Sequence, residues 1–213
     1  ADDTDWTGRF GDKLERHVGV RGPGDRAADA RWSIGGTHNL ENATAAVAAA
    51  ASAGVSVEQA VDALSRFEGV KRRMERTATV ADIAIYDDFA HHPTAIAKSI
   101  HSMRRRYPGH RVVVAVDPRS NTMKLGVHND TLAGALSDAD LVWMYRPEEL
   151  GEDFEASLGE LGTRLRVFKD YDRLANDMST RVLAGDQVVF MSNGGFGSAR
   201  QTLTALLQRT RGS

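Results

Sequence analysis

From residue 69 onward, short runs of β-forming residues alternate with helical patterns of apolar residues. Strands separated by helices at this spacing form a parallel sheet with helices on its faces. The runs at 111–116 and 187–191, which are continuously apolar after their first residue, are typical of strands buried on both faces. The sequence therefore predicts an α/β fold, with a Rossmann-like domain over residues 69–213. The expected strands are 79–86, 111–116, 140–145, 164–168 and 186–191, and the expected helices are 93–106, 129–137, 152–161, 171–183 and 197–209.

Residues 1–68 do not follow this alternation. Residues 1–35 are rich in Asp, Arg and Gly without a sustained period, and we expect the first ten to be a flexible terminus. The alanine- and valine-rich segment 42–53 predicts a buried helix, and residues 57–67 predict an amphipathic helix with Ser56 as its N-cap. We interpret residues 1–68 as the helical end of a separate domain. The chain begins without methionine inside a polar stretch, so we expect that domain to be truncated.

Composition excludes several classes of protein. The formal net charge of -2 gives no electrostatic case for binding nucleic acid or an anionic membrane. The absence of cysteine excludes a disulfide scaffold and thiolate metal sites. No apolar run approaches the roughly 20 residues of a membrane-spanning helix, and no signal peptide is recognisable. We therefore expect a cytoplasmic enzyme or binding module.

Polar clusters follow three of the expected strands. In an open parallel sheet, ligands bind outside the carboxyl ends of the strands, so these clusters are expected to converge on one edge. The alternative is that Asp, Ser, Asn and Gly simply form turns. That alternative explains the glycines well, but it explains Arg119, Lys124 and the pair His91-His92 poorly. The three clusters are residues 87–92, 117–124 and 192–197.

The first cluster has several interpretations. Asp87, Asp88, His91 and His92 could bind a divalent metal, since carboxylates and imidazoles suit such ions. Neighbouring residues on one turn rarely all point at one centre, so we favour two other roles. One aspartate could cap the following helix, or a carboxylate could accept a hydrogen bond from a ribose hydroxyl.

The glycine-rich segment 194–197 does not make a dinucleotide fingerprint. That fingerprint follows the first strand of its domain, whereas these glycines follow the last expected strand. Close approach of the backbone to a ligand is the better interpretation. No phosphate-binding loop of the GxxxxGK[ST] type occurs anywhere in the chain.

Two further motifs precede the sheet. The basic run 71–73 lies at the junction of the two parts, where an arginine could hold a phosphate, although such runs are usually solvated surface. Asn39 and Asn42 lie three residues apart at a helix start and could both face one ligand. A carboxamide pairs well with the N6 and N7 edge of adenine. The alternative for both is helix capping, which we favour for Asn42 taken alone.

Together these residues resemble the Mur ligase family over about residues 36–210. The family's GxHNxxN segment is matched by Gly36, His38, Asn39 and Asn42. Its hinge arginine is matched by Arg73, and its DDYAH-type segment by residues 87–92 with Phe89 in place of tyrosine. The segments 118–124 and 191–197 are most similar to the branch that joins a murein tripeptide to UDP-N-acetylmuramate.

This resemblance implies an ATP- and Mg²⁺-dependent, ADP-forming ligase of peptidoglycan recycling. Its small-molecule substrates would be UDP-N-acetylmuramate and the tripeptide L-Ala-γ-D-Glu-meso-diaminopimelate, whose third residue the sequence leaves open between diaminopimelate and lysine. On the family pattern, Asn39 and Asn42 meet adenine. Asp88 holds the ribose and Arg73 the phosphates, and the catalytic residues are Arg73, Asp88 and His91. The peptide would be bound by His91, Arg119, Ser120, Asn121, Lys124, Ser192 and Asn193.

The resemblance also identifies what this sequence lacks. Residues 1–68 correspond to the end of the central ATP-binding domain, and residues 69–213 to the C-terminal domain. The UDP-sugar domain, the phosphate loop and the main metal ligands are absent, so we expect no metal site in these residues and no ligase activity from them alone. The alternatives are the sister ligase that adds L-alanine to UDP-N-acetylmuramate, and a non-catalytic binding module on the same fold.

Overall fold

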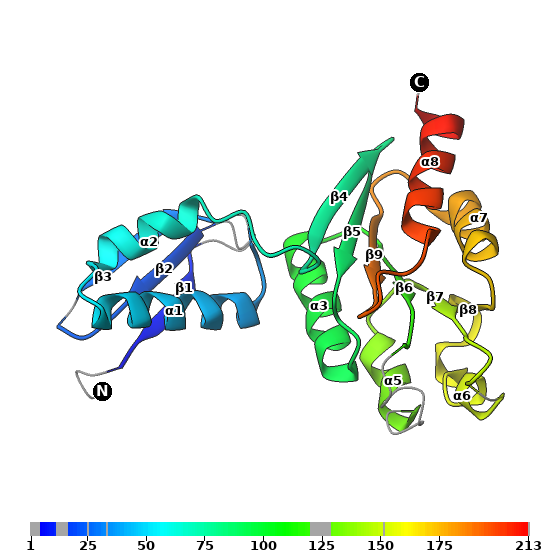
Figure 1. The fold of residues 1–213 in the computed structure, drawn as a ribbon, viewed down its shortest axis with the longest axis horizontal. Helices are drawn as coiled ribbons and strands as arrows, with labels where there is room; N and C mark the ends of the chain where they lie inside the picture. The colour runs from blue at the N-terminus through cyan, green and yellow to red at the C-terminus, as the bar shows by residue number, and fades with distance from the viewer. Residues whose placement is uncertain are drawn as a thin grey trace. The chain divides into compact units, whose positions relative to one another are not determined.

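The computed structural model describes residues 5–11, 17–24, 26–32, 34–119, 129–150 and 152–212. These residues form two compact units, which Figure 1 shows together. The first unit lies within residues 1–69 and 101–108, and the second lies within residues 70–100 and 109–213.

The first unit contains an antiparallel sheet that the sequence did not predict. Its strands pair in the order β1-β2-β3. The expectation of a flexible terminus over the first ten residues is therefore wrong for Thr7–Phe10, which forms β1. The strands are short, their exposed positions include the charged residues Arg9, Arg21 and Asp29, and of their apolar side chains only Val18 and Val20 are buried. The strands are β1 (Thr7–Phe10), β2 (His17–Arg21) and β3 (Ala27–Arg31).

Both helices expected in this unit are present. Helix α1 (Thr37–Ser52) begins before residue 42, and helix α2 (Val57–Ser65) begins after Ser56. Ser56 accepts a hydrogen bond from the backbone N–H of Gln59, and the Gln59 side chain accepts one from Ser56, so the predicted N-cap is confirmed as a capping box. Apolar side chains from both helices and from the sheet make one core.

The second unit is a six-stranded sheet in the order β4-β5-β9-β6-β7-β8. Strand β4 pairs antiparallel with β5, and every other neighbouring pair is parallel. The predicted mostly parallel α/β sheet is thus confirmed, and its last strand in sequence lies in its middle. The strands are β4 (Glu75–Val80), β5 (Ile83–Asp88), β6 (Val112–Val116), β7 (Leu141–Tyr145), β8 (Leu165–Phe168) and β9 (Gln187–Met191).

The hairpin of β4 and β5 differs from the predicted strands. A single strand was expected over residues 79–86, but β4 and β5 form a hairpin closed by Ala81 and Asp82. Both turn residues have positive φ, 49° and 61°. Such turns usually contain Asn-Gly or Asp-Gly, so the pair Ala-Asp gave no signal in the sequence.

Helices cover both faces of this sheet. One face packs against α7 and α8 through a core that includes Ile85, Trp143 and Phe190, and in Figure 1 α3 and α5 lie on the other side. The helix expected over 152–161 is replaced by a short helix and a 3₁₀ helix, since Gly159 and Gly162 weaken helical continuity. The elements are α3 (Pro93–Arg106), α5 (Asn129–Leu136), α6 (Glu152–Ala156), the 3₁₀ helix η1 (Gly159–Arg164), α7 (Tyr171–Arg181) and α8 (Ala199–Arg211).

Among the described residues, no helix has both the length and the apolar character needed to cross a bilayer.

Candidate functional site

The described parts of the three polar clusters lie at one edge of the second unit. They follow β5, β9 and β6, which are neighbours in the sheet. The backbone N–H of Ser192 donates to the carbonyl of Asp88 (3.1 Å), and the N–H of Asp117 donates to the carbonyl of Met191 (3.0 Å). The predicted convergence of these strand ends is therefore confirmed. We call this edge the rim.

Arg119 is held at the rim by two partners. Its Nε lies 2.9 Å from Oδ2 of Asp117, whose side chain is fully buried. Its Nη2 donates to the Tyr171 hydroxyl at 2.7 Å. That hydroxyl donates in turn to Asp117 Oδ2 at 2.9 Å. The guanidinium therefore has a defined position before any ligand arrives, although the Arg119 side chain is still 43% exposed.

The environment of Tyr171 is itself closely packed. Its ring stacks on Tyr145 with centroids 4.1 Å apart. Burial raises the pKa of Tyr171, and the hydrogen bond to Asp117 raises it further, so the hydroxyl keeps its proton and remains a donor. Gly197 has a φ of 53°, and a Cβ there would lie 2.7 Å from the Tyr171 ring. The glycine is therefore required at this position by its close approach to the Tyr171 ring, while the interpretation that the 194–197 backbone approaches a ligand stays a prediction.

Burial also changes the ionisation of Asp117. It raises the pKa of this carboxyl, and the hydrogen bond from Tyr171 and the charge of Arg119 oppose the rise. Its Oδ1 atom is buried and receives no hydrogen bond from a described residue. The Tyr171 hydroxyl and the Arg119 charge therefore both stabilise the ionised form of this buried carboxyl.

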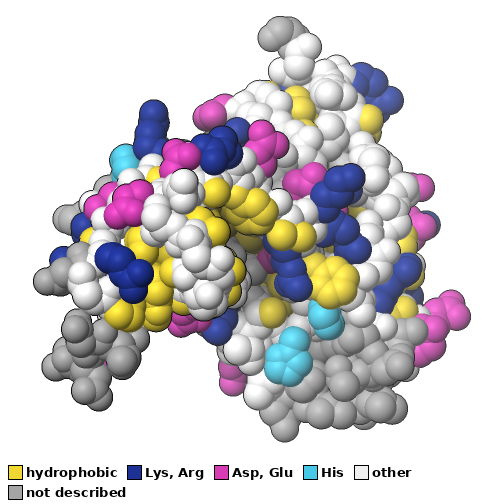
Figure 2. All heavy atoms as spheres, turned by 60° about the vertical axis from the view of Figure 1, so that its left-hand side comes forward, with side chains coloured by type: hydrophobic (Ala, Val, Ile, Leu, Met, Phe, Trp, Pro, Cys, Tyr) yellow, Lys and Arg dark blue, Asp and Glu magenta, His cyan; other side chains and the backbone are white. Residues whose placement is uncertain are grey.

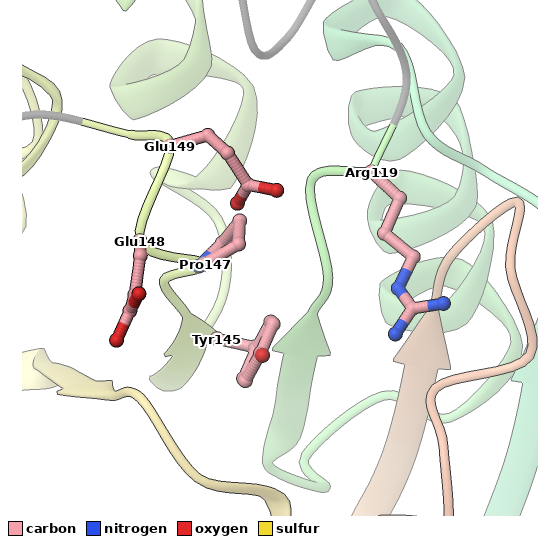
Figure 3. A pocket seen from close by; sticks show the side chains of 5 residues that line it. All are labelled: Arg119, Tyr145, Pro147, Glu148 and Glu149. Atoms are coloured by element: carbon pink, nitrogen blue, oxygen red, sulfur yellow. The ribbon is translucent and has the colours of Figure 1, made fainter.

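A pocket of about 500 Å³ lies beside Arg119 (Figure 3). Arg119 lines one side, and the chain leaving β7 lines the other with Tyr145, Pro147, Glu148 and Glu149. This volume is within the usual range of small-ligand sites.

The first aspartate of the 87–92 cluster is bound to arginines. Asp87 is buried, and its Oδ2 lies 3.5 Å from Arg72 Nε and 3.3 Å from Arg200 Nη2. Arg72 also donates from Nη2 to the Ser192 carbonyl. Arg72 therefore joins the chain before β4 to the rim, and its charge is used within the fold.

Arg73, unlike Arg72, is exposed to solvent. Its side chain is exposed, and its guanidinium carbon lies 5.1 Å from the centre of the Phe89 ring. The His91 ring contacts the same phenylalanine edge-on, and its Nδ1 is 2.8 Å from the Phe89 carbonyl oxygen. Figure 2 shows basic side chains gathered beside hydrophobic and histidine side chains on one face. Of the two arginines here, Arg73 is the one available to an anion.

Asp88 lies deeper than the ribose interpretation requires. It is 3% exposed, and its Oδ2 accepts a hydrogen bond from Ser99 Oγ at 2.5 Å. Burial raises the pKa of Asp88, and the Ser99 hydroxyl opposes part of that rise. In this structure the carboxylate anchors α3 to the end of β5, and its contact with a ribose stays a prediction.

Replacing Ser99 with alanine is expected to destabilise the protein in a pH-dependent way. Ser99 favours the charged form of Asp88, so its loss raises that pKa further and costs about 1.5–3 kcal/mol where Asp88 is ionised. The pKa of Asp88 is higher in the folded protein than its ordinary value of 3.8, so the folded protein loses stability as the pH rises above 3.8 and Asp88 ionises. The loss in the free energy of unfolding caused by Ser99→Ala should therefore be larger at pH 8 than at pH 4.

Urea unfolding followed by tryptophan fluorescence at both pH values measures this difference. Ser102→Ala is the matched control, because Ser102 is also buried on α3 and donates to no carboxylate among the described residues. A deficit for Ser99→Ala that is equal at pH 4 and pH 8 would contradict the role assigned to Asp88.

The four side chains considered for a metal have separate partners. Asp87 and Asp88 are engaged as described above, and His91 contacts Phe89. The His92 ring accepts a hydrogen bond from the N–H of Thr94 (3.3 Å). A histidine therefore caps the start of α3, and the interpretation of an aspartate as this cap is wrong. No group of three or more His, Asp or Glu side chains in the described part of the chain is placed to hold a metal ion.

Asn39 and Asn42 lie in the first unit. The N-cap of α1 is Gly36, so both asparagines are inside the helix and the capping interpretation is wrong. Asn39 Nδ2 donates to the Gly35 carbonyl at 2.8 Å, while Asn42 is exposed. Their contact with adenine stays a prediction.

The remaining predicted residues differ in their surroundings. Ser192 is buried and accepts a hydrogen bond from the N–H of Gly194 at 2.9 Å, so its hydroxyl shapes the glycine turn. Asn193 Oδ1 is buried and has no hydrogen-bond partner among the described residues. Three predicted peptide-binding residues lie outside the described residues, namely Ser120, Asn121 and Lys124.

Sequence reasoning missed several residues of the site. Tyr171 begins α7, Arg200 lies in the first turn of α8, and Glu148 and Glu149 follow β7. The ends of β7 and β8 belong to the same edge of the sheet as the predicted clusters. Polar and aromatic residues just after these two strands were the available signal.

Comparison with known proteins identifies relatives of this chain. The model of the Mur ligase, glutamate ligase domain matches residues 72–194. The UDP-N-acetylmuramate–L-alanyl-γ-D-glutamyl-meso-2,6-diaminoheptandioate ligase of Haemophilus influenzae is 38% identical over 88% of this chain and 42% of its own length. The UDP-N-acetylmuramate–L-alanine ligase of Chloroflexus aggregans is 34% identical over 83% of this chain and 34% of its own length.

A solved structure agrees with these matches. The crystal structure of a murein peptide ligase from Psychrobacter arcticus superimposes with a TM-score of 0.69 at 36% identity. The match covers 95% of this chain and 44% of that one. This chain therefore spans less than half the length of these relatives. With more than half of its residues matched by the family model and with ligases of this kind as relatives, the chain belongs to the Mur ligase family.

Proposed function

We propose that this chain is the C-terminal part of an ATP-dependent ligase that joins a murein tripeptide to UDP-N-acetylmuramate in peptidoglycan recycling. The observation that carries the proposal is Arg119, fixed at the rim beside a pocket of about 500 Å³. An arginine with a preset fork binds carboxylates well, and a murein tripeptide carries several. The identity with the tripeptide ligase of Haemophilus influenzae supports this choice of branch.

The proposed reaction converts a carboxylate into an amide. ATP is the substrate that supplies the γ-phosphoryl group, and the muramate carboxylate becomes an acyl phosphate. ADP is released by this transfer. The amine of the peptide's first residue then attacks the acyl carbon, and the amide forms as phosphate leaves. Such chemistry depends mainly on positioning and on neutralising charge.

Several residues of this chain suit the nucleotide. Arg73 is exposed and suits the phosphates, since its guanidinium lies over the Phe89 ring. Its charge also favours the ionised form of Asp88 and so lowers the pKa of that carboxyl. Asn39 and Asn42 are proposed for adenine, Asp88 for the ribose, and His91 for a catalytic role near the phosphates. Mg²⁺ would accompany ATP, and none of these residues is proposed to bind it. The proposal includes a cytoplasmic location.

The peptide would bind along the rim. The proposed contacts are His91, Arg119, Ser120, Asn121, Lys124, Ser192 and Asn193. The structure supports Arg119 most directly, because this side chain is both anchored and exposed at a pocket.

Steady-state assays of the native full-length protein test this function. We expect ADP release that depends on UDP-N-acetylmuramate and on the tripeptide, with L-alanine a much poorer substrate. We also expect residues 1–213 alone to release no ADP with both substrates present. Efficient use of L-alanine in place of tripeptide would assign the protein to the sister ligases, to which the relative of Chloroflexus aggregans belongs.

A further inference from the structure

Asn193 and Gly194 form the only Asn-Gly pair in the sequence, and they lie in the rim just after β9. Asparagine is a thermolabile residue, because the backbone nitrogen that follows it can attack the carbonyl carbon of its side chain. Glycine favours this attack, since it has no side chain to block the approach and its backbone adopts many conformations. Gly194 is also exposed, so water reaches the pair.

The two groups that would react are held differently in the structure. The Gly194 N–H donates a hydrogen bond to Ser192 Oγ at 2.9 Å, and Ser192 is only 1% exposed. The carboxamide oxygen of Asn193 is buried and accepts no hydrogen bond from a described residue. The attacking nitrogen is therefore restrained by one hydrogen bond, whereas the carbonyl group that it would attack is not anchored through its oxygen.

The rim itself requires a glycine at position 194. A Cβ there would lie 2.6 Å from Cδ of Arg119, and 3.3 Å and 3.4 Å from Nη1 and Nε of the same side chain. A larger residue in place of Gly194 would therefore push against Arg119. The same closeness puts a positive charge beside Gly194, and a nearby cation favours the deprotonated nitrogen that the attack requires.

We propose that Asn193 is a site of spontaneous deamidation, and that the Ser192 hydroxyl slows the reaction by holding the Gly194 N–H. The Gly194 nitrogen bonds to Cγ of Asn193, and the proton it gives up leaves with the side-chain nitrogen as ammonia, which produces a cyclic imide. Water then opens either carbonyl of the imide and leaves aspartate or isoaspartate at position 193. Each product adds a carboxylate near Arg119, so the modification lowers the positive charge that the rim offers to an anion.

Deamidation rates in the native full-length protein test this proposal. The folded protein is incubated at slightly alkaline pH, and digestion followed by mass spectrometry measures the fraction of Asn193 converted with time. Ser192→Ala is expected to react roughly three to ten times faster than the wild type, because no hydrogen bond to Gly194 has to break before the attack. Ser192→Cys keeps the size of the side chain but offers only a weak acceptor, so it should also react faster, and it decides the result if Ser192→Ala does not fold.

Controls in the same protein make the result specific. Ser198→Ala removes a hydroxyl from the same segment that donates to Asp172 instead, at 3.4 Å, and should leave the rate at Asn193 unchanged. Asn39 and Asn42 are internal references, because both lie within α1 and neither is followed by glycine. They should stay unmodified over the period in which Asn193 reacts.

Wild-type protein unfolded in guanidinium chloride tests the site apart from its protection. Asn193 should react faster there than in the folded protein, and faster than Asn39 or Asn42. No preferential reaction of Asn193 in the unfolded chain would overturn the site. Equal rates for folded wild type, Ser192→Ala and Ser192→Cys would overturn the protective role of the hydroxyl. Because each outcome is measured by mass, none depends on ligase activity.

Discussion

Replacing Arg119 with lysine is expected to lower kcat/KM for the murein tripeptide by roughly tenfold to a hundredfold in the full-length protein. Lysine keeps the charge but replaces the planar guanidinium, whose separate nitrogens contact Asp117 and Tyr171, with a single ammonium that lacks the fork geometry suited to a carboxylate. Because Arg119 is assigned to the peptide and not to the nucleotide, KM for ATP should stay unchanged. Steady-state kinetics with each substrate varied in turn measure both values.

Two further variants separate binding from general damage. Arg181→Lys makes the same substitution at the exposed end of α7 and should have wild-type kinetics. Tyr171→Phe keeps the ring but removes the hydroxyl that holds Arg119, so it should raise KM for the tripeptide by a smaller factor than Arg119→Lys. An Arg119→Lys protein with unchanged tripeptide kinetics would be inconsistent with the peptide site placed here.

Replacing Phe190 with alanine is expected to lower the free energy of unfolding by about 3–5 kcal/mol. Phe190 is 1% exposed in the central strand β9 and packs edge-on against Phe196 with ring centroids 5.1 Å apart. The lost side chain would leave a cavity beneath the rim that rigid neighbouring strands cannot fill. Urea unfolding followed by the fluorescence of Trp143, which is buried in the same core, measures the change.

Phe67→Ala is the matched control for this prediction. Phe67 is 45% exposed, so the same loss of a phenyl ring should change stability by about 0.5 kcal/mol or less. If Phe190→Ala is no more destabilising than Phe67→Ala, the buried contact between Phe190 and Phe196 does not stabilise the sheet as the structure indicates.

Much of the second unit could be predicted because its signals are local. The runs at residues 112–116 and 188–191 are apolar throughout, as is typical of strands covered on both faces. The helix over 93–106 has its predicted bounds. The convergence of the polar clusters at the rim could be predicted from one topological rule, namely that the carboxyl ends of parallel strands share an edge of the sheet.

The parts that were missed depend on contacts distant in sequence. Strands β1 to β3 pair with one another across loops, and their sequences contain few apolar residues to reveal a buried face. The site residues Tyr171 and Glu149 are ordinary residues at the ends of β8 and β7 until the fold brings them near Arg119. No local pattern reports which helix start will face which strand end.

The central place of β9 has a consequence for biosynthesis. Strands β5 and β6 each pair with β9, which is the last of the sheet's strands to be synthesised. Until residues 187–191 emerge, the nascent chain holds two half-sheets with exposed strand edges, which are prone to aberrant pairing. A chain that ends before this segment would therefore lack the strand that joins β5 to β6, instead of losing only an edge strand of the sheet.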